Sequence, residues 1–435
     1  MVLINMSYMS YLKELEKSQW FKRDQIEEIQ NKKLRFLINH VYENIPYFHF
    51  LLKENNLQPE DIKSLEDVAK IPIQRRYTIK NHLDKLVNIS FKKGRLMKDF
   101  TSGSTNGERL RIYRDKDNIN KNIAAEMRAY GWYNIDYLHE KFYYLIGADY
   151  DIEWEKKFSK KLKYFLSKTV KLSPLQLKTD DFEIFLSKIK KSNRRILYST
   201  PTGGCMLIKK LKQRNEKIDI DIFISTDYSL LKQQRRFIKD FFNCEIYDIY
   251  GTSEVWSVAF ECREHSGYHL TSENVMMEIV NDHNERVNSG EKGHIILTDL
   301  TNFVMPFIRY DVGDIGILSD EICSCGKGLH LMKPVYDQIV YRDSEYIISL
   351  NSQKVFIPEL SFILDDFSKI SNFQIIQHKT KDIELNIVKE QNYNENYEEY
   401  IKSTLIKKLG DVEIFFNYLD DIQPDINGKH KYIIK

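Results

Sequence analysis

The sequence has few cysteines and almost no net charge. Its five cysteines are sparse and odd in number, which does not fit the disulfide framework of a small secreted protein. Lys and Arg total 65 against 63 for Asp and Glu, so the net charge is +2. A balanced charge gives no electrostatic basis for binding nucleic acid or an anionic membrane, and we predict neither partner.

Long apolar segments are also lacking. No window approaches the run of about 20 apolar residues that a membrane-spanning helix needs. Residues 1–20 lack the basic start, apolar centre and small-residue cleavage site of a signal peptide, so we expect a cytoplasmic protein. Aromatic residues make up 13% of the 435 residues, which argues against disorder in a chain long enough for several domains.

Apolar periodicity predicts an α/β fold. Residues 6–60 and 116–135 have helical spacing, whereas a loop and then a strand are expected over 92–115. Further along the chain, helix-like stretches separate short β-rich segments, and this alternation favours a largely parallel sheet. These segments are 142–148, 195–200, 220–226 and 245–251.

The pattern changes in the last third of the chain. From 269 to 348, strands follow one another without intervening helices, which predicts antiparallel β structure. We therefore expect a large N-terminal domain over 1–340, with a helical lead-in over 1–90 and a β-rich subregion over 262–340. Residues 341–435 are expected to form a small α+β domain.

Residues Thr101–Gly107, with the sequence TSGSTNG, suit a phosphate-holding loop. Gly103 and Gly107 let the backbone approach an anion closely. Hydroxyls that can donate to phosphate oxygens belong to Ser102, Ser104 and Thr105. The chain has no Gly-x4-Gly-Lys-Ser/Thr sequence, so this is not a Walker loop. The alternative is an ordinary polar turn.

A second motif, Tyr247–Glu254, reads YDIYGTSE. It ends a predicted strand with an aromatic residue, a glycine, two hydroxyls and a carboxylate. Tyr250 could stack on a purine, and Glu254 is a hard oxygen ligand that could hold Mg²⁺ near phosphates. Taken alone, the motif could equally be a turn at a strand end.

A third motif, Phe307–Asp314, reads FIRYDVGD. Asp314 follows a glycine at what we expect to be a strand end. A carboxylate there can accept both ribose hydroxyls of a nucleotide, as acidic residues do in other nucleotide sites. A surface turn is the alternative.

The three motifs in this order resemble those of the adenylate-forming superfamily, which includes acyl-CoA synthetases, luciferases and peptide-synthetase adenylation domains. The phenylacetate–CoA ligase branch, with its capsular-polysaccharide biosynthesis homologues, is the most similar. The resemblance covers nearly the whole chain, including a helical N-terminal segment, a hinge within 341–360 and a closing Asn427-Gly428-Lys429. It implies ATP-dependent activation of a carboxylic acid as acyl-AMP with release of pyrophosphate, transfer of the acyl group to coenzyme A, and a mobile C-terminal domain.

The resemblance also implies a role for each motif position. Thr101–Gly107 would cradle the β- and γ-phosphates. Lys429 would stabilise negative charge on the α-phosphate and carboxylate as they react. The other implied positions are Asp227, Tyr250, Gly251 and Thr252 at the adenine and its loop, Ser253 at phosphate, Glu254 at Mg²⁺, and Asp314 and Arg342 at the ribose.

The sequence departs from the branch pattern at several of these places. Asn106 replaces a usual Gly, and Ser225-Thr226-Asp227 replaces Ser-Gly-Glu beside the adenine. Tyr341 replaces the Gly before the hinge Arg, and residues 351–356 replace a Gly-bearing hinge turn. These departures leave a second class in play, a non-catalytic homologue that only binds a nucleotide.

Cysteine and histidine form a candidate metal site. Cys323-Ser324-Cys325-Gly326 is a compact turn that can aim two thiolates at one ion, and Cys262, His265 and His269 lie upstream. The resemblance selects Cys262, His269, Cys323 and Cys325, ahead of His265 or His330. Four such ligands suit a structural Zn²⁺ with no open position. The alternative is a set of reduced, partly buried cysteines, as we expect for Cys205 and Cys244 in the core.

The acceptor of the acyl group stays open. Coenzyme A is the default that the resemblance implies. The capsule-type homologues suggest instead an amine or hydroxyl on a sugar or another metabolite.

Overall fold

The computed structural model describes residues 7–88, 90–91, 96–101, 109–147, 169–335, 340–422 and 430–435. The chain forms two compact units, each assembled from two chain segments. Unit 1 comprises Met1–Glu140 and Ile249–Val335, and unit 2 comprises Lys141–Asp248 and Tyr336–Lys435. The domain boundary predicted at 340/341 remains a prediction.

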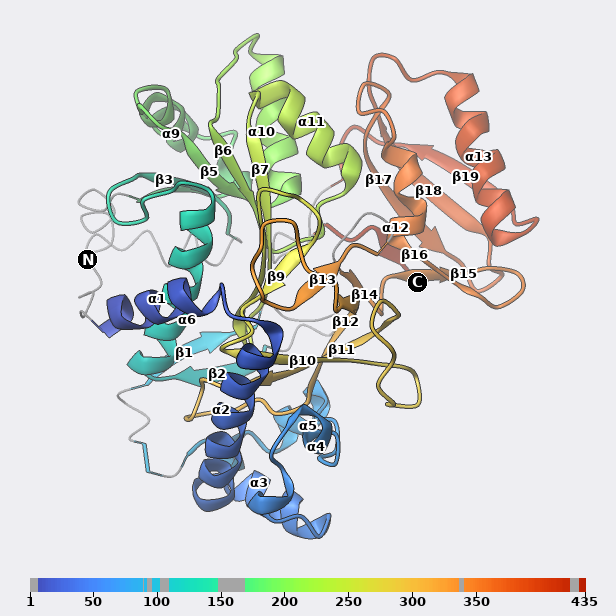
Figure 1. Cartoon of the computed structure of the whole chain (residues 1–435). Coiled ribbons are helices and arrows are strands. Elements are labelled where there is room, and N and C mark those ends of the chain that lie inside the picture. The colour runs from blue at the N-terminus through green and yellow to red at the C-terminus, as the bar shows by residue number, and fades with distance from the viewer. Residues whose placement is uncertain are drawn as a thin grey trace. The chain divides into compact units, whose positions relative to one another are not determined.

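Helices dominate the first segment of unit 1, as the spacing over 6–60 predicts (Figure 1). Pro46 begins α3 at a position where a missing N–H costs nothing, and the Asp115 side chain caps α6 by accepting from the Asn118 N–H. The helices are α1 (Ser7–Ser18), α2 (Arg23–Asn44), α3 (Pro46–Glu54), α4 (Leu65–Val68), α5 (Arg76–Asn81) and α6 (Lys116–Trp132).

The second segment of unit 1 is an antiparallel sheet, which confirms the prediction for this region. In spatial order its strands are β10 (Val275–Val280), β11 (Lys292–Asp299), β12 (Tyr310–Ser319), β13 (Leu331–Lys333), β9 (Tyr268–Leu270) and β8 (Trp256–Glu261). A separate antiparallel ribbon consists of β1 (Met97–Phe100) and β2 (Arg111–Arg114). The helices of the first segment pack with strand and loop residues of this sheet in one apolar core.

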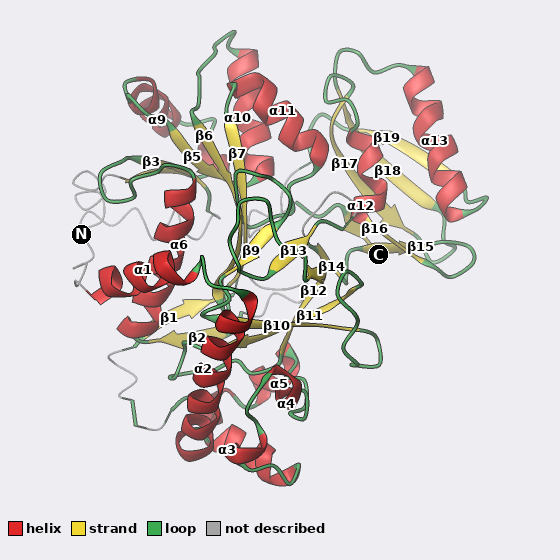
Figure 2. Cartoon of the chain, viewed as in Figure 1, coloured by secondary structure: helices red, strands yellow, loops and turns green. Residues whose placement is uncertain are grey.

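Unit 2 contains the predicted parallel sheet, and Figure 2 shows helices beside its strands. The strands in spatial order are β4 (Thr169–Leu172), β3 (Phe142–Leu145), β5 (Ile196–Ser199), β6 (Ile222–Ser225) and β7 (Glu245–Thr252). The helices are α9 (Asp180–Lys190), α10 (Pro201–Gln213) and α11 (Lys232–Phe242). Strand β7 passes from one unit to the other, because its first half pairs with β6 and its second half with β8.

The C-terminal part of unit 2 has its own four-stranded sheet, in the order β19-β18-β17-β20. Helix α13 buries Ile401 and Leu405 in the same apolar cluster as this sheet. The elements are β14 (Tyr341–Arg342), β15 (Tyr346–Ile348), β16 (Lys354–Phe356), α12 (Ile357–Leu360), β17 (Ile370–Gln377), β18 (Ile383–Lys389), α13 (Glu395–Leu409), β19 (Ile414–Tyr418) and β20 (Ile433–Ile434). Parallel and antiparallel sheets with helices confirm the predicted α/β class with α+β elements.

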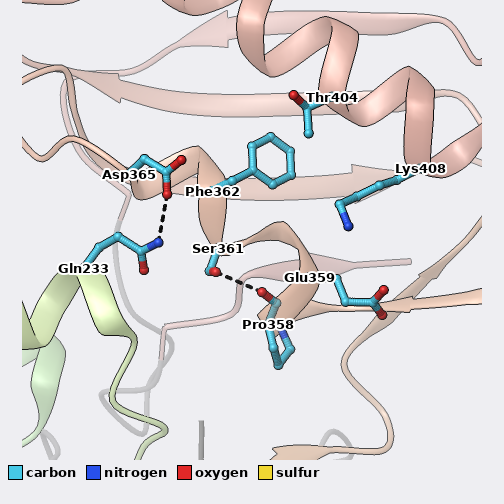
Figure 3. Close-up of a pocket in the computed structure, with 8 residues that line it drawn as sticks. All are labelled: Gln233, Pro358, Glu359, Ser361, Phe362, Asp365, Thr404 and Lys408. Atoms are coloured by element: carbon cyan, nitrogen blue, oxygen red, sulfur yellow. Dashed lines mark hydrogen bonds between the residues drawn. The ribbon is translucent and has the colours of Figure 1, made fainter. Parts of the chain in front are cut away.

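Helix α11 contacts this C-terminal part. The rings of Phe237 and Phe367 stack with centroids 4.7 Å apart, and Gln233 donates a 2.8 Å hydrogen bond to Asp365. Beside this hydrogen bond lies a cavity of about 360 Å³, where Phe362 and Lys408 belong to the C-terminal side (Figure 3). The cavity is lined mainly by polar side chains, and none of the predicted site residues belongs to its lining.

Candidate nucleotide and metal sites

Glu254 lies in the turn between β7 and β8 and is 8% exposed. Its Oε1 atom accepts a 2.9 Å hydrogen bond from the Tyr310 hydroxyl and lies 3.6 Å from Nη1 of Arg76. Burial, with the nearby Glu254 carboxylate, raises the pKa of Tyr310 above its usual value, so this hydroxyl remains a donor at neutral pH. Tyr310 belongs to the third sequence motif, so the second and third motifs are in direct contact.

Arg76 connects the first motif to the same carboxylate. Its Nη2 atom donates a 2.8 Å hydrogen bond to Oγ1 of Thr101, which also accepts from the Leu110 N–H at 2.9 Å. One guanidinium therefore contacts Thr101 of the first motif and Glu254 of the second. The remaining predicted phosphate-loop residues lie outside the described residues, and they are Ser102, Gly103, Ser104, Thr105 and Gly107.

Asp314 and Tyr250 form a second link between motifs. Both residues are buried, and the Tyr250 hydroxyl donates to Oδ2 of Asp314 at 2.8 Å. The expectation that Asp314 ends a strand is wrong, because β12 continues from Tyr310 to Ser319. Gly313 has φ of +75°, a backbone conformation that favours glycine within this long strand. Stacking of Tyr250 on adenine stays a prediction.

Arg114 fixes the backbone of the Glu254 turn. It is 1% exposed, and its Nη2 atom donates to the carbonyl oxygens of Ser253 and of Glu254, the latter at 3.1 Å. Its Nη1 atom pairs with the Asp99 carboxylate at 2.9 Å. Burial lowers the pKa of Arg114, but the adjacent Asp99 opposes that shift and the guanidinium stays charged.

Close backbone approach explains the glycine of the second motif. A Cβ on Gly251 would lie 2.6 Å from the Trp256 carbonyl oxygen, where the β7–β8 register shifts. Trp256 itself has φ of +74°. The Thr252 hydroxyl accepts from the Val255 N–H at 3.0 Å and closes the turn. The turn is therefore held at a fixed geometry by a bulge, a hydroxyl and a buried guanidinium.

Two of the predicted nucleotide residues belong to unit 2. Asp227 follows β6 with φ of +68°, a conformation that Asp tolerates better than most residues. Arg342 lies in β14 and is exposed. The roles of Asp227 and Arg342 at the nucleotide stay predictions, and Lys429 lies outside the described residues.

Sequence reasoning missed Arg76, Arg114 and Tyr310. Arg114 ends a predicted apolar strand, where a charged residue at a buried position could have signalled a polar partner. Tyr310 lies inside the third motif, from which only Asp314 was predicted as a site residue. Arg76 carries no such signal, because its importance lies only in the two side chains that it contacts.

The four predicted metal ligands lie together in unit 1. Ligand atoms of Cys262, His269, Cys323 and Cys325 are all within 4.8 Å of one another. Sγ of Cys262 is 3.6 Å from Sγ of Cys323, and Sγ of Cys325 is 3.2 Å from Nε2 of His269. A tetrahedral ion with Zn–S bonds of about 2.3 Å separates two sulfurs by about 3.8 Å, so the donor set fits such an ion.

The two substitute histidines have other partners. Nδ1 of His265 pairs with Glu261 at 3.0 Å, and the His330 ring contacts the Ser272 hydroxyl at 3.0 Å. Burial lowers the pKa of His330 to about 3, which keeps it neutral. The cluster in the described residues therefore has the four ligands that the resemblance selects, and neither His265 nor His330 is among them.

A phenylacetate-coenzyme A ligase from Thermus thermophilus is 23% identical over 374 residues, which span 81% of this chain and 79% of that protein. Protein CapK from Staphylococcus aureus is 22% identical over 68% of this chain and 64% of its own. The model of the CapK C-terminal domain matches residues 347–435. The chain is a homologue of phenylacetate–coenzyme A ligases and CapK.

A solved structure shows that this chain also shares its fold with a ligase. 2-Hydroxyisobutyryl-CoA ligase, in the postadenylation state with its acyl-AMP, superposes with a TM-score of 0.78 at 12% identity. The match covers 96% of this chain and 91% of that one, so the chain has the adenylate-forming ligase fold. Within the described residues, no helix is long and apolar enough to cross a membrane. The cytoplasmic location stays a prediction.

Proposed function

We propose that this ligase homologue activates a carboxylic acid with ATP and then transfers the acyl group to coenzyme A. A carboxylate oxygen attacks the α-phosphorus of ATP, the bond to the β-phosphate breaks, and pyrophosphate leaves. The coenzyme A thiol then attacks the acyl carbon, and AMP leaves with the carboxylate oxygen. The observation that carries the proposal is the contact of all three motifs through Arg76, Glu254 and Tyr310 in unit 1.

The roles of the site residues follow from their contacts. Both contacts that the described residues make with the Glu254 carboxylate use Oε1, so Oε2 is the atom we assign to Mg²⁺, which would neutralise phosphate charge when bound. Thr101 and Ser253 would lie at the phosphates. Tyr250 and Asp314, already paired, would hold the adenine and ribose.

The remaining assignments concern the loops and unit 2. Lys429 would stabilise the charge that develops at the α-phosphate, because a compact ammonium suits concentrated negative charge. The other proposed binding positions are Ser102, Gly103, Ser104, Thr105, Gly107, Asp227, Gly251, Thr252 and Arg342. The C-terminal domain would rotate between the two steps.

We further propose that the Cys262, His269, Cys323 and Cys325 cluster holds a structural Zn²⁺. Thiolate and imidazole are the ligands that Zn²⁺ takes in closed sites, and four protein ligands leave no position for a substrate. Hydrogen bonding from the Cys262 thiol lowers the pKa of Cys325, which favours a thiolate within the cluster. Metal analysis of the purified protein tests this assignment, with about one zinc per chain expected.

ATP–pyrophosphate exchange over a panel of carboxylic acids tests the proposed reaction. We expect exchange with at least one acid, and its loss in Glu254→Gln and Lys429→Ala variants that remain folded. Silence across a broad panel would favour the non-catalytic nucleotide binder. The matched control is Glu291→Gln, because Glu291 is an exposed carboxylate in a β turn of the same unit.

The similarity to CapK supports an alternative acceptor of the acyl group, an amine or a hydroxyl compound instead of coenzyme A. With the activated acid identified, coenzyme A and a set of amines and sugars are compared for AMP release above the acid-only rate. Stimulation by coenzyme A alone supports the thioester. Stimulation by an amine or hydroxyl compound alone would move the function to amide or ester formation.

A further inference from the structure

The loop that follows the last metal ligand places a buried lysine between two indoles. Lys327 is 7% exposed, and its Nζ atom lies 4.7 Å from the ring centroid of Trp132 and 5.2 Å from that of Trp20. Trp20 follows α1 and Trp132 ends α6. An ammonium that has left water needs such aromatic faces in place, because burial without partners is costly.

The backbone of this loop also meets the segment between α1 and α2. The Gly328 N–H donates to the Gln19 carbonyl oxygen at 3.0 Å. A Cβ on Gly328 would lie 1.8 Å from the Phe21 carbonyl oxygen, so only glycine allows this approach. The Gln19 side chain in turn accepts from Trp132 Nε1 at 2.7 Å. The α1–α2 connection is therefore fitted against the loop and α6 together.

Trp132 also contacts the metal cluster. Its ring meets the His269 ring edge-on, with centroids 5.5 Å apart and planes at 78°. Lys327 is two residues beyond Cys325 in the sequence, so a metal bound by Cys323 and Cys325 restrains the start of the loop that carries it. Helices α1 and α6 pack against each other (Figure 1), with Leu12 and Leu15 in their shared apolar cluster.

We propose that metal binding by the cluster restrains the N-terminal helix α1, an effect that we call the staple. Lys327 is the positioning residue that transmits metal binding to Trp20, Trp132 and Gln19. An ion held by the four ligands fixes the loop Cys323–Gly328. The fixed loop presents an ammonium and an N–H at the end of α1. Without the ion, α1 would lose the restraint that this loop provides, and it would keep its contacts with α6 and the hydrogen bond from Ser18 to Glu273. This inference rests on metal binding by the cluster and not on the ligase reaction.

Hydrogen–deuterium exchange of the full chain, zinc-loaded and after chelation, tests the staple. We expect exchange in the peptide covering residues 16–21 to rise about tenfold on chelation, while helix α13 of unit 2 is unchanged. Unchanged protection of residues 16–21 after complete zinc removal would overturn the proposal. A protein that takes up no zinc would also overturn the proposal. That result would say nothing about the ligase reaction, which ATP–pyrophosphate exchange tests separately.

Lys327→Met separates the staple from general loss of the metal. Methionine keeps the apolar stem and removes the charge, and all four ligands remain. We expect normal zinc content together with faster exchange at residues 16–21. The matched control is Lys354→Met, whose ammonium lies 4.7 Å from the Tyr346 ring in unit 2 and should not affect α1. Equal protection in the Lys327→Met variant and the wild type would show that Lys327 transmits nothing.

Discussion

The hydrogen bond between Tyr310 and Glu254 offers a quantitative test of the nucleotide site. Tyr310→Phe removes one hydroxyl and keeps the ring, so apolar packing is preserved. A hydrogen bond to a buried charged group contributes about 1.5–3 kcal/mol to stability. Arg76, 3.6 Å from the same oxygen and partly exposed, would compensate by less than about 1 kcal/mol. With this compensation, we expect the free energy of unfolding to fall by about 0.5–3 kcal/mol.

Tyr47→Phe is the matched control for this variant. Tyr47 is also buried in unit 1, but its hydroxyl donates to the neutral side chain of Gln74. Loss of such a bond costs about 0.5–1.5 kcal/mol. Urea unfolding measures both changes, and the larger effect should belong to Tyr310→Phe.

Function should separate the two variants further. Without the Tyr310 hydroxyl, the Glu254 carboxylate is less well oriented, so the Mg²⁺ concentration for half-maximal ATP–pyrophosphate exchange should rise several-fold. Tyr47→Phe should leave it unchanged. Equal stability losses and an unchanged Mg²⁺ requirement in Tyr310→Phe would refute the assignment of Glu254 as an oriented metal ligand.

Other substitutions test separate parts of the account. Gly251→Ala places a Cβ 2.6 Å from the Trp256 carbonyl oxygen, so the free energy of unfolding should fall by about 1–3 kcal/mol, as measured by urea or thermal unfolding. In the control Gly131→Ala in α6, the new Cβ meets no atom within 4 Å, so the free energy of unfolding should rise by up to about 1 kcal/mol. Burial raises the pKa of Glu126 from 4.5 to about 7, so the folded state binds this proton more tightly and stability falls as pH rises between these values. Glu126→Gln should remove that slope and gain up to about 3 kcal/mol over the wild type between pH 4.5 and 7, and a pH-independent difference would contradict the shift. Cys325→Ser should lower zinc content well below one per chain by metal analysis, and unchanged content would exclude Cys325 as a ligand.

Secondary structure was largely predictable because it depends on local periodicity. Helices at 7–54 and the parallel strands β3, β5, β6 and β7 carry clear apolar patterns. Strand β8 was missed, since Trp256–Glu261 is buried almost throughout and has no alternation to reveal it. Asp314 was placed at a strand end because Gly313 suggested a turn, but the glycine serves a positive φ within β12 instead.

The site was only partly predictable, because its decisive contacts join distant parts of the chain. Motif order indicated that Thr101, Glu254 and Asp314 belong to one site. Arg76 and Arg114 were missed because no local pattern marks a guanidinium that meets a turn far along the sequence. The metal ligands were found through a family resemblance, since the long gap from Cys262 to Cys323 is uninformative by itself.

Transfer of a labelled oxygen is the most direct test of the central claim, that this chain forms an acyl-adenylate. The protein is incubated with ATP, Mg²⁺, hydroxylamine as a general acceptor and a carboxylic acid labelled with ¹⁸O in its carboxylate. Mass spectrometry of the nucleotide should find AMP that carries one labelled oxygen, because the attacking carboxylate oxygen stays on the α-phosphorus. Label in inorganic phosphate with formation of ADP, or no labelled nucleotide from any acid of the panel, would contradict the account.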